Sequence, residues 1–488
     1  LGITAYAKNQ TTSSSFIEDN YVDPNSVSLS FPEKKRNLIY IFLESMENTY
    51  SSEEYGGAFS ENTIPELTEL SLENENFSGD QETLNGGVPL TGATWTVGAM
   101  FAQTSGLPLK IPIEGNSMDT QKEFFPGLTT LGDILDDAGY DQTLLIGSDG
   151  TFGGRKLYFE EHGNYNVMDY NYCAKNGLIP EGYRVFWGFE DKKLFDFAKD
   201  TLKEKAASDE PFNLTMLTVD THFEDGYVCD ECDDTFGENQ YANVMACSSR
   251  RVAEFVKWVQ SQDFYENTTI VISGDHLTMD SDFCEDVPDT YERKVFTTYI
   301  NAPVQPTDTT KYREYSTFDQ FPTTLAALGV SIEGNHLGLG TNLFSSEITL
   351  IEKYDKNVVD DELEKQSDFM DEMTKNIKQV KKEEPSDNDD TTEETEQTET
   401  QDQPLAEIEV TPYDYHKGYY TITVQNIVPD DVHTVRCAIW QEEDQSDLIW
   451  YEAWREISAI GRESIRSMFT VLQMKGIQFC WEARREKL

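Results

Sequence analysis

The segment Asn37-Leu38-Ile39-Tyr40-Ile41-Phe42-Leu43-Glu44 indicates the fold class. Its central run, Leu38–Leu43, is strand-sized and apolar or aromatic throughout, without the alternation of a strand that faces water on one side. Such a run is typical of a parallel sheet, because helices cover both faces of that kind of sheet. The run ends in a carboxylate, Glu44, at the edge where parallel sheets build their sites.

Similar segments follow along the chain, separated by longer stretches with helical periodicity. We predict strands at Asn37–Leu43, Gln142–Ile146, Leu214–Val219, Thr268–Ile272 and Phe296–Ile300. We predict helices at Leu131–Ala138, Lys192–Glu204, Ala242–Val259 and Thr317–Leu328. This alternation predicts an α/β domain whose mostly parallel sheet has helices on both faces.

The charge balance excludes one class of function. The 488 residues include 90 acidic and 38 basic ones, for a net charge of -52. A nucleic-acid-binding protein has a basic face, so we expect no nucleic-acid partner. An acidic surface suits a cation-rich place such as a cell wall, or an adaptation to high salt.

Changes in composition divide the chain into four parts. We expect a lead-in at 1–36, the α/β domain at 37–350, an acidic helical or disordered linker at 351–404 and a small β-sandwich at 405–488. Within the linker, residues 383–402 contain ten acidic residues and no basic one, so we expect this stretch to be flexible and to be cut first by proteases.

The C-terminal region contains four β-rich segments before its pattern changes. They are Ile408–Val410, Tyr419–Val424, Val435–Trp440 and Leu448–Tyr451. The segment from Arg455 onward is basic, with seven Lys or Arg residues and four Glu. We consider two interpretations of this tail, a basic helix or a frameshift that truncates the sandwich, and we favour the second.

No apolar run approaches the roughly 18 residues that span a bilayer. The sequence begins at Leu1 without an initiator Met or a signal peptide, so we expect upstream transmembrane or export segments to be absent from this chain. Five of the seven cysteines lie within 173–284. We expect disulfides there, with free thiols or a metal site at Cys229-Asp-Glu-Cys232 as alternatives.

Three further motifs carry candidate chemistry. In the turn that starts Gly92-Ala93-Thr94-Trp95-Thr96, we predict Thr94 as the N-cap of a helix, where backbone N–H groups and the dipole favour an anion. The strand Thr268–Ile272 runs into Asp275 and His276, whose side chains are ligands that divalent ions accept. Another predicted strand leads to Thr221-His222.

In this order, the motifs Ile41-Phe42-Leu43-Glu44-Ser45, Gly92-Ala93-Thr94-Trp95-Thr96, Phe152-Gly153-Gly154-Arg155, Thr221-His222 and Gly274-Asp275-His276 resemble the phosphoglycerol transferases, including lipoteichoic acid synthases. These enzymes belong to the alkaline phosphatase/sulfatase superfamily. The resemblance covers roughly 35–345. The C-terminal segments resemble a repeat of Gram-positive surface proteins, whose aromatic residues either bind a glycan or fill a small core.

The resemblance implies functional residues and a cofactor. One divalent ion, Mn²⁺ or Mg²⁺ with Zn²⁺ possible, would be bound by Glu44, Thr94, Asp275 and His276. Thr94 would be the nucleophile, and we predict that Thr96 instead bonds back to its helix or packs on a neighbour. Arg155 would bind the substrate and His222 would lie near the leaving group or acceptor. Lipoteichoic acid synthases carry Trp at the position of Gly153, so the lipid-headgroup contacts differ here.

The implied reaction has two steps at the extracellular face of a bacterial membrane. Thr94 attacks phosphatidylglycerol and releases diacylglycerol, and a hydroxyl of a glycan or teichoic-acid-type acceptor then attacks the glycerophosphoryl-threonine. We expect a monomeric ectodomain. Alternatives are a phosphoethanolamine transferase, a phosphodiesterase or sulfatase-like hydrolase, and a non-catalytic glycan-binding surface protein. A sulfatase is disfavoured because Thr94-Trp95-Thr96-Val97 lacks its Cys/Ser-x-Pro-x-Arg pattern, and bound metal would argue against a non-catalytic binder.

Overall fold

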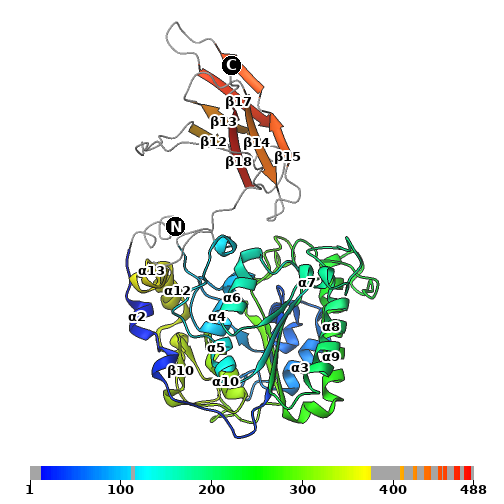
Figure 1. Cartoon of the computed structure of the whole chain (residues 1–488), viewed down its shortest axis with the longest axis vertical. Coiled ribbons are helices and arrows are strands. Elements are labelled where there is room, and N and C mark those ends of the chain that lie inside the picture. Colours follow the sequence, from blue (N-terminus) through cyan, green and yellow to red (C-terminus); the bar gives the residue numbers. More distant parts are fainter. Residues whose placement is uncertain are drawn as a thin grey trace, which may run out of the picture. The chain divides into compact units, whose positions relative to one another are not determined.

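The computed structural model describes residues 12–111 and 116–374 and, beyond them, the seven C-terminal strands. The chain divides into two compact units, 1–382 and 383–488 (Figure 1). The predicted flexible stretch 383–402 lies outside the described residues. No helix in the described ranges is both long and apolar enough to cross a membrane.

The first unit is built on a seven-stranded sheet with the order β3-β8-β7-β2-β6-β4-β5. Its strands are β2 (Asn37–Leu43), β3 (Gly86–Gly87), β4 (Asp141–Ile146), β5 (Asn166–Met168), β6 (Phe212–Leu217), β7 (Thr268–Gly274) and β8 (Val295–Ile300). Strands β7, β2, β6, β4 and β5 run parallel to one another, whereas β8 is antiparallel to both of its neighbours, β7 and β3. The mostly parallel α/β sheet predicted from the sequence is confirmed.

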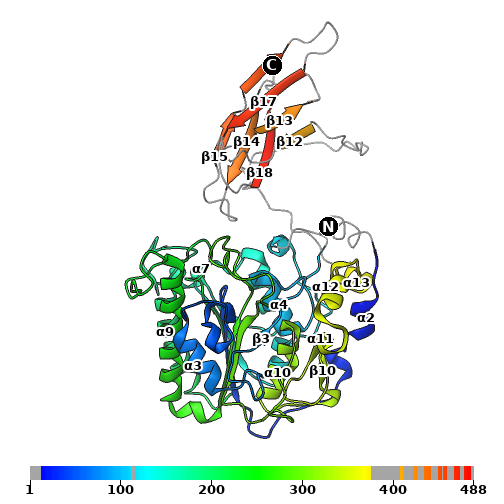
Figure 2. The same cartoon turned by 180° about the vertical axis from the view of Figure 1, so that it is seen from behind.

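Helices cover both faces of this sheet (Figures 1 and 2). On one face are α4 (Thr96–Ser105), α5 (Leu131–Asp137), α6 (Arg155–Glu161) and α10 (Gln320–Ala327). On the other are α3 (Pro65–Glu73), α7 (Tyr170–Lys175), α8 (Asp191–Lys205) and α9 (Gln240–Gln260). The remaining helices are α2 (Phe16–Asn20), α11 (Leu350–Tyr354), α12 (Lys356–Glu364) and α13 (Asp368–Thr374), and all of these lie in the first unit.

Short elements complete this unit. Two small antiparallel pairs join β1 (Leu29–Ser30) to β9 (Ser331–Ile332) and β10 (His336–Leu337) to β11 (Gly340–Thr341). The 3-10 turns are Pro24–Ser26, Asn48–Tyr50, Glu53–Tyr55, Ser117–Thr120, Phe152–Gly154, Asp263–Asn267, Thr317–Asp319 and Glu333–Asn335.

Strand β2 lies in the middle of the sheet, and all of its residues are buried. Tyr40 and Phe42 belong to the hydrophobic core on one face, and Ile39 and Ile41 to the core on the other. This double burial explains the continuous apolar run in the sequence, since a central parallel strand has no face for polar residues.

The end of β2 is aligned with the end of β7. Leu43 pairs with Gly274, and the Asp275 N–H donates to the Leu43 carbonyl at 3.0 Å. Gly274 is required here, because a Cβ at this position would lie 1.9 Å from the Met46 carbonyl oxygen. The register therefore puts Glu44 and Asp275 at the same edge of the sheet.

The second unit contains two antiparallel sheets, with strand orders β12-β13-β17-β16 and β15-β14-β18 (Figure 1). Its strands are β12 (Glu407–Val410), β13 (Thr421–Gln425), β14 (Thr434–Trp440), β15 (Ile449–Glu452), β16 (Trp454–Ser458), β17 (Arg466–Leu472) and β18 (Gln478–Arg484). Residues after Arg455 supply β17, an inner strand of one sheet, and β18, an edge strand of the other. The described parts of the tail are therefore strands, and the helix interpretation is wrong, whereas the frameshift interpretation stays a prediction.

Candidate functional site

Two carboxylates and an imidazole meet at the carboxyl ends of β2 and β7. His276 Nε2 lies 3.3 Å from Glu44 Oε1 and 3.5 Å from Asp275 Oδ2. One ligand atom from each of the three side chains lies within 4.8 Å of the others, and all three are buried. The structure thus brings together three of the residues that the sequence singled out as metal ligands.

Hydrogen bonds fix the orientation of each group. Asp275 Oδ1 accepts the backbone N–H groups of Ser45 and His276 at 2.8 and 2.7 Å, and Ser45 Oγ donates to Glu44 Oε1 at 2.8 Å. His276 Nδ1 lies 2.8 Å from the Leu277 carbonyl, which only accepts, so Nδ1 carries a proton. Burial disfavours the charged ring, but the Asp275 and Glu44 carboxylates outweigh this and raise the pKa of His276 to about 10. Without a metal, Nε2 therefore also carries a proton that faces both carboxylates, and a bound cation would take the place of that proton.

The cluster has the chemistry of a divalent metal site. Asp275 Oδ2 is buried and has no hydrogen-bond partner in the structure. Burial first, and the Glu44 carboxylate second, raise the pKa of Asp275 to about 8. A buried group of two carboxylates needs a positive charge, and oxygen ligands with one imidazole suit a hard or borderline divalent ion. The residues present therefore fit the metal that the resemblance implies.

A hydroxyl group completes the cluster, and it belongs to Thr96. Thr96 Oγ1 lies 3.2 Å from Glu44 Oε2, to which it donates, and 3.4 Å from His276 Nε2. Thr96 is the first residue of α4, and Trp95 at the N-cap makes no side-chain cap bond. The backbone N–H groups that open α4 are thus directed to the same place as the hydroxyl, where a phosphate group would find donors and the positive end of the helix dipole.

The placement of Thr94 differs from the sequence prediction. We predicted that Thr94 caps the helix and that Thr96 bonds back to it, but the helix begins two residues later and Thr94 is exposed. Trp95 has an extended backbone (φ -143°, ψ 160°), so the chain enters the helix only at Thr96. The prediction that Thr94 is the helix cap is therefore wrong, and the hydroxyl that lies beside the carboxylates belongs to Thr96.

Arg155 is a buried cation held by backbone carbonyl groups. Its Nη2 donates to Asp149 O at 2.7 Å and its Nε to Phe152 O at 3.2 Å. It forms no ion pair with any residue that the structure describes. Burial lowers the pKa of Arg155 to about 10, against the attraction of Glu44 and other carboxylates, so the group remains charged at neutral pH. Such a guanidinium keeps its charge available for an anionic ligand.

The turn Phe152–Gly154, which precedes Arg155, has glycine at the position where lipoteichoic acid synthases carry tryptophan, and the packing of Gly153 explains this difference. Gly153 has φ +63°, and a Cβ there would lie 2.4 Å from Val97 Cγ2 on the first turn of α4. A tryptophan has no room at this position. The glycine lets the loop before Arg155 pack closely against the start of the helix that carries Thr96.

His222 lies beside an aromatic wall, formed by Trp187 and Phe152, that the sequence analysis missed. Its Nδ1 lies 2.6 Å from the Phe223 carbonyl, and its ring centroid is 4.7 Å from that of Trp187. The ring centroid of Trp187 is in turn 6.4 Å from that of Phe152, and the Arg155 guanidinium lies over the Phe152 ring. Burial lowers the pKa of His222, while Glu44 opposes the shift. The wall therefore links the His222 and Arg155 sides of the site.

The sequence signal for this wall was the segment Val185-Phe186-Trp187-Gly188, an apolar aromatic run outside every predicted strand and helix. The disulfides expected from the sequence are not confirmed, since the five described cysteines are free thiols.

Both units of the chain are similar to known proteins. The family model described as Sulfatase matches residues 36–330, and the model of the GBS Bsp-like repeat matches residues 409–465. Phosphoglycerol transferase I of Escherichia coli (strain 55989 / EAEC) is 32% identical over 328 residues, which cover 66% of this chain and 40% of that protein. Phosphoglycerol transferase I of Citrobacter koseri gives the same identity and coverage.

The chain thus spans about two fifths of the length of these curated relatives. A solved structure of a protein in the alkaline phosphatase superfamily from Vibrio parahaemolyticus has a TM-score of 0.50 and 19% identity. It covers 66% of this chain and 74% of that one, and this likeness concerns the fold alone.

Proposed function

Because the chain belongs to the sulfatase family, we propose that it transfers a glycerophosphate group from phosphatidylglycerol to a hydroxyl group of a cell-envelope glycan or polymer. The reaction would take place at the extracellular face of a bacterial membrane. The observation that carries the proposal is the Thr96 hydroxyl, which lies at the start of α4 within 3.4 Å of both Glu44 and His276. The 32% identity to phosphoglycerol transferases supports the choice of substrate class.

Glu44, Asp275, His276 and Thr96 would hold one divalent ion. This set keeps three of the ligands expected from the sequence and replaces Thr94 with Thr96. When bound, Mn²⁺, Mg²⁺ or Zn²⁺ would favour ionisation of the threonine hydroxyl and offset charge on the phosphoryl oxygens. Ser45 and Leu277 would keep the carboxylates and the imidazole in position, since both contact them through hydrogen bonds.

In the first step, Thr96 Oγ1 attacks the phosphorus atom of phosphatidylglycerol. The bond from phosphorus to the diacylglycerol oxygen breaks, the proton of the threonine hydroxyl ends on that oxygen, and diacylglycerol leaves. The glycerophosphoryl group is then an ester of Thr96. The N–H groups at the start of α4 and the Arg155 guanidinium would stabilise the negative charge on the phosphoryl oxygens.

In the second step, the acceptor hydroxyl attacks the phosphorus atom, the bond from phosphorus to Thr96 Oγ1 breaks, and the proton lost by the acceptor ends on Thr96 Oγ1, which regenerates the hydroxyl. His222 is placed to accept the proton of the acceptor, because its Nδ1 proton is engaged by the Phe223 carbonyl and Nε2 is the basic atom. Trp187 beside His222 offers a flat apolar surface for a sugar or glycerol group.

The test is mass spectrometry of the intact protein after incubation with phosphatidylglycerol vesicles and Mn²⁺, together with an assay of released diacylglycerol. We expect a glycerophosphoryl adduct on the peptide that contains Thr96. Thr96→Ala should abolish both adduct and release. Thr94→Ala, two residues away and exposed, is the matched control and should retain both.

Three outcomes would contradict the proposal. An adduct on Thr94 would restore the sequence prediction. Reaction with phosphatidylethanolamine vesicles but not with phosphatidylglycerol would indicate a phosphoethanolamine transferase. Diacylglycerol release without any acceptor product, even with added cell-wall glycan, would indicate a hydrolase.

A further inference from the structure

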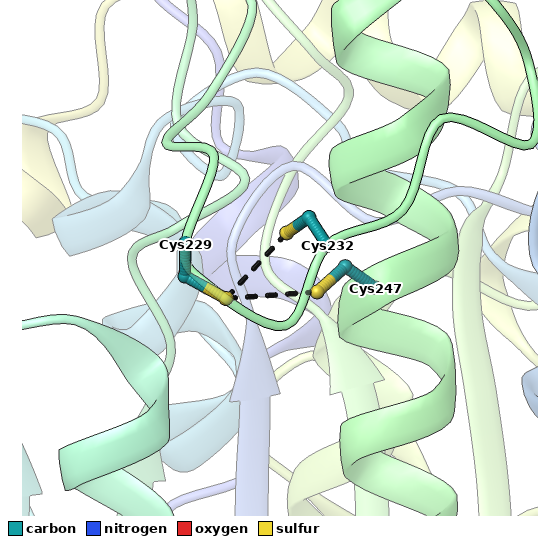
Figure 3. A group of neighbouring side chains, drawn as sticks. All are labelled: Cys229, Cys232 and Cys247. Carbon is teal, nitrogen blue, oxygen red and sulfur yellow. Dashed lines mark hydrogen bonds between the residues drawn. The ribbon is translucent and has the colours of Figure 1, made fainter.

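A second cluster of ligand atoms lies outside the site described above. Cys229 and Cys232 lie in the segment that follows β6, and Cys247 lies on α9. Cys229 Sγ is 3.6 Å from Cys232 Sγ and 3.8 Å from Cys247 Sγ, and all three sulfur atoms lie within 4.8 Å of one another. Figure 3 shows the three side chains turned toward a common point.

These distances match the spacing of thiolates around a metal ion. Zinc binds cysteine sulfur at about 2.3 Å in a tetrahedral arrangement, which separates neighbouring sulfur atoms by about 3.8 Å. A disulfide would require one pair to approach to about 2.05 Å and would leave the third sulfur without a partner. Convergence of three sulfur atoms from two separate segments is therefore better explained by a shared ion.

Two hydrogen-bond donors surround the Cys229 sulfur. Arg251 Nη2 donates to Cys229 Sγ at 3.1 Å, and the Glu231 N–H donates to the same sulfur at 3.3 Å. Three thiolates with one Zn²⁺ would carry a net charge of minus one, and the buried Arg251 guanidinium beside them also forms ion pairs with Asp220 and Glu231. Donors of this kind around a metal-bound sulfur orient the ligand and stabilise its ionised form.

We propose that Cys229, Cys232 and Cys247 bind one Zn²⁺ ion as thiolates. Binding converts three thiols to thiolates and releases three protons to solvent. Cys232 is half-buried and lines an open hollow of about 420 Å³ together with Asp233 and Asp234, so a fourth ligand from solvent would reach the ion on that side.

The ion would fasten the segment that carries His222 to α9. Arg251, on α9, also forms an ion pair with Asp220 at 3.3 Å, two residues before His222. The neighbouring Thr221 Oγ1 donates to the Glu44 carbonyl at 2.6 Å. The zinc site is thus a structural support for the catalytic edge of the sheet, distinct in its ligands from the carboxylate site.

The experiment compares metal content and spectra of the full chain with those of three variants, all purified under reducing conditions without chelator. Cys247→Ser removes one proposed ligand, Cys284→Ser is the control cysteine outside the cluster, and Glu44→Gln disables the carboxylate site. Elemental analysis should show one zinc equivalent less in Cys247→Ser than in Cys284→Ser. After exchange with Co²⁺, a sulfur-to-cobalt charge-transfer band should appear in the wild type, Cys284→Ser and Glu44→Gln, and disappear in Cys247→Ser.

If Cys247→Ser does not fold, Cys232→Ser at the half-buried position serves in its place, with the same expected loss. The proposal is overturned if the wild type shows no thiolate-to-cobalt band. It is also overturned if the protein isolated without reductant is lighter by two hydrogens per bridge and holds no zinc, which indicates a disulfide, or if all three thiols react at once with a thiol reagent in the native protein. None of these readouts depends on transferase activity.

Discussion

Replacing Gly153 with alanine should destabilise the first unit by an amount that the structure allows us to work out. The added Cβ would lie 2.4 Å from Val97 Cγ2, and the residue has φ +63°. The left-handed backbone costs a non-glycine residue about 1–2 kcal/mol. Overpacking against Val97 adds about 1–3 kcal/mol. We therefore expect Gly153→Ala to lower the free energy of unfolding by about 2–5 kcal/mol.

Gly177→Ala is the matched control, because Gly177 has φ +69° but no atom lies within 4 Å of an added Cβ. It should cost only the backbone part, about 1–2 kcal/mol. The measurement is guanidinium chloride denaturation followed by tryptophan fluorescence. Val97→Ala, which removes the clashing methyl group, should reduce the additional cost of Gly153→Ala by about 1–3 kcal/mol in a double-mutant cycle.

The reasoning fails if Gly153→Ala costs no more than Gly177→Ala, or if the cost is unchanged in the Val97→Ala background. Either result would mean that the loop before Arg155 does not pack against α4 as described. Diacylglycerol release should fall together with stability in Gly153→Ala, because the contact aligns Arg155 with Thr96, whereas Gly177→Ala should leave it unchanged.

Three other predictions concern single residues. Glu44→Gln should weaken Mn²⁺ binding by at least about 100-fold in calorimetry, since even outer partners of a metal ligand contribute 10–100-fold; unchanged binding would remove Glu44 from the ligand set. In Arg155→Lys, the lysine cannot reproduce both hydrogen bonds to the carbonyl groups of Asp149 and Phe152. We expect kcat/KM for phosphatidylglycerol to fall by about 10–100-fold, the equivalent of roughly 1.5–3 kcal/mol. The circular dichroism spectrum should be unchanged. Burial lowers the pKa of His162, but hydrogen bonding to Asp133 outweighs this and raises it above its ordinary value. The stability that the protonated His162 contributes is fully present below a pH of about 6.5 and is lost as pH rises through the folded-state pKa. The difference in unfolding free energy between wild type and His162→Gln should therefore shrink from acid to alkaline pH. A difference that grows with pH would contradict the assignment.

Much of the sheet and its carboxylate edge could be predicted because the signals are local. The apolar run that forms β2 ends at Glu44, and the run that forms β7 ends one residue before Asp275. Since the carboxyl ends of parallel strands meet at one edge, strand identity alone was enough to expect these side chains near one another. The resemblance read from the same residues is also confirmed, since the chain belongs to the sulfatase family and is 32% identical to phosphoglycerol transferase I of Escherichia coli.

The reactive hydroxyl could not be predicted because it depends on where one helix begins. Thr94 and Thr96 are both acceptable near a helix start, and the outcome is decided by the extended backbone of Trp95. Sequence patterns leave an uncertainty of about two residues at helix ends. That is the separation of the two threonines.

A metal site at the pair Cys229 and Cys232 was one alternative predicted from the sequence, but the third cysteine, Cys247, was missed for a different reason. Cys229 and Cys232 form a visible pair, but the third sulfur comes from Cys247, which the sequence places in the middle of an amphipathic helix. Only the packing of α9 against the segment after β6 brings it within 3.8 Å of Cys229. Spacing rules for metal sites do not register a ligand supplied by tertiary packing.

Because Arg155 forms no ion pair with the described residues, its charge would have a consequence for how the protein meets the proposed anionic lipid donor. The chain carries a net charge of -52, so at long range it would repel the proposed donor, phosphatidylglycerol, and the attraction of one buried guanidinium would act only at contact. Dissolved ions screen charges separated by more than the Debye length, about 8 Å at physiological ionic strength. If the proposed donor is bound at a membrane, added salt would weaken the distant repulsion more than the contact, and encounter of the protein with that membrane would become faster as ionic strength rises. This is the reverse of electrostatically steered association between opposite charges.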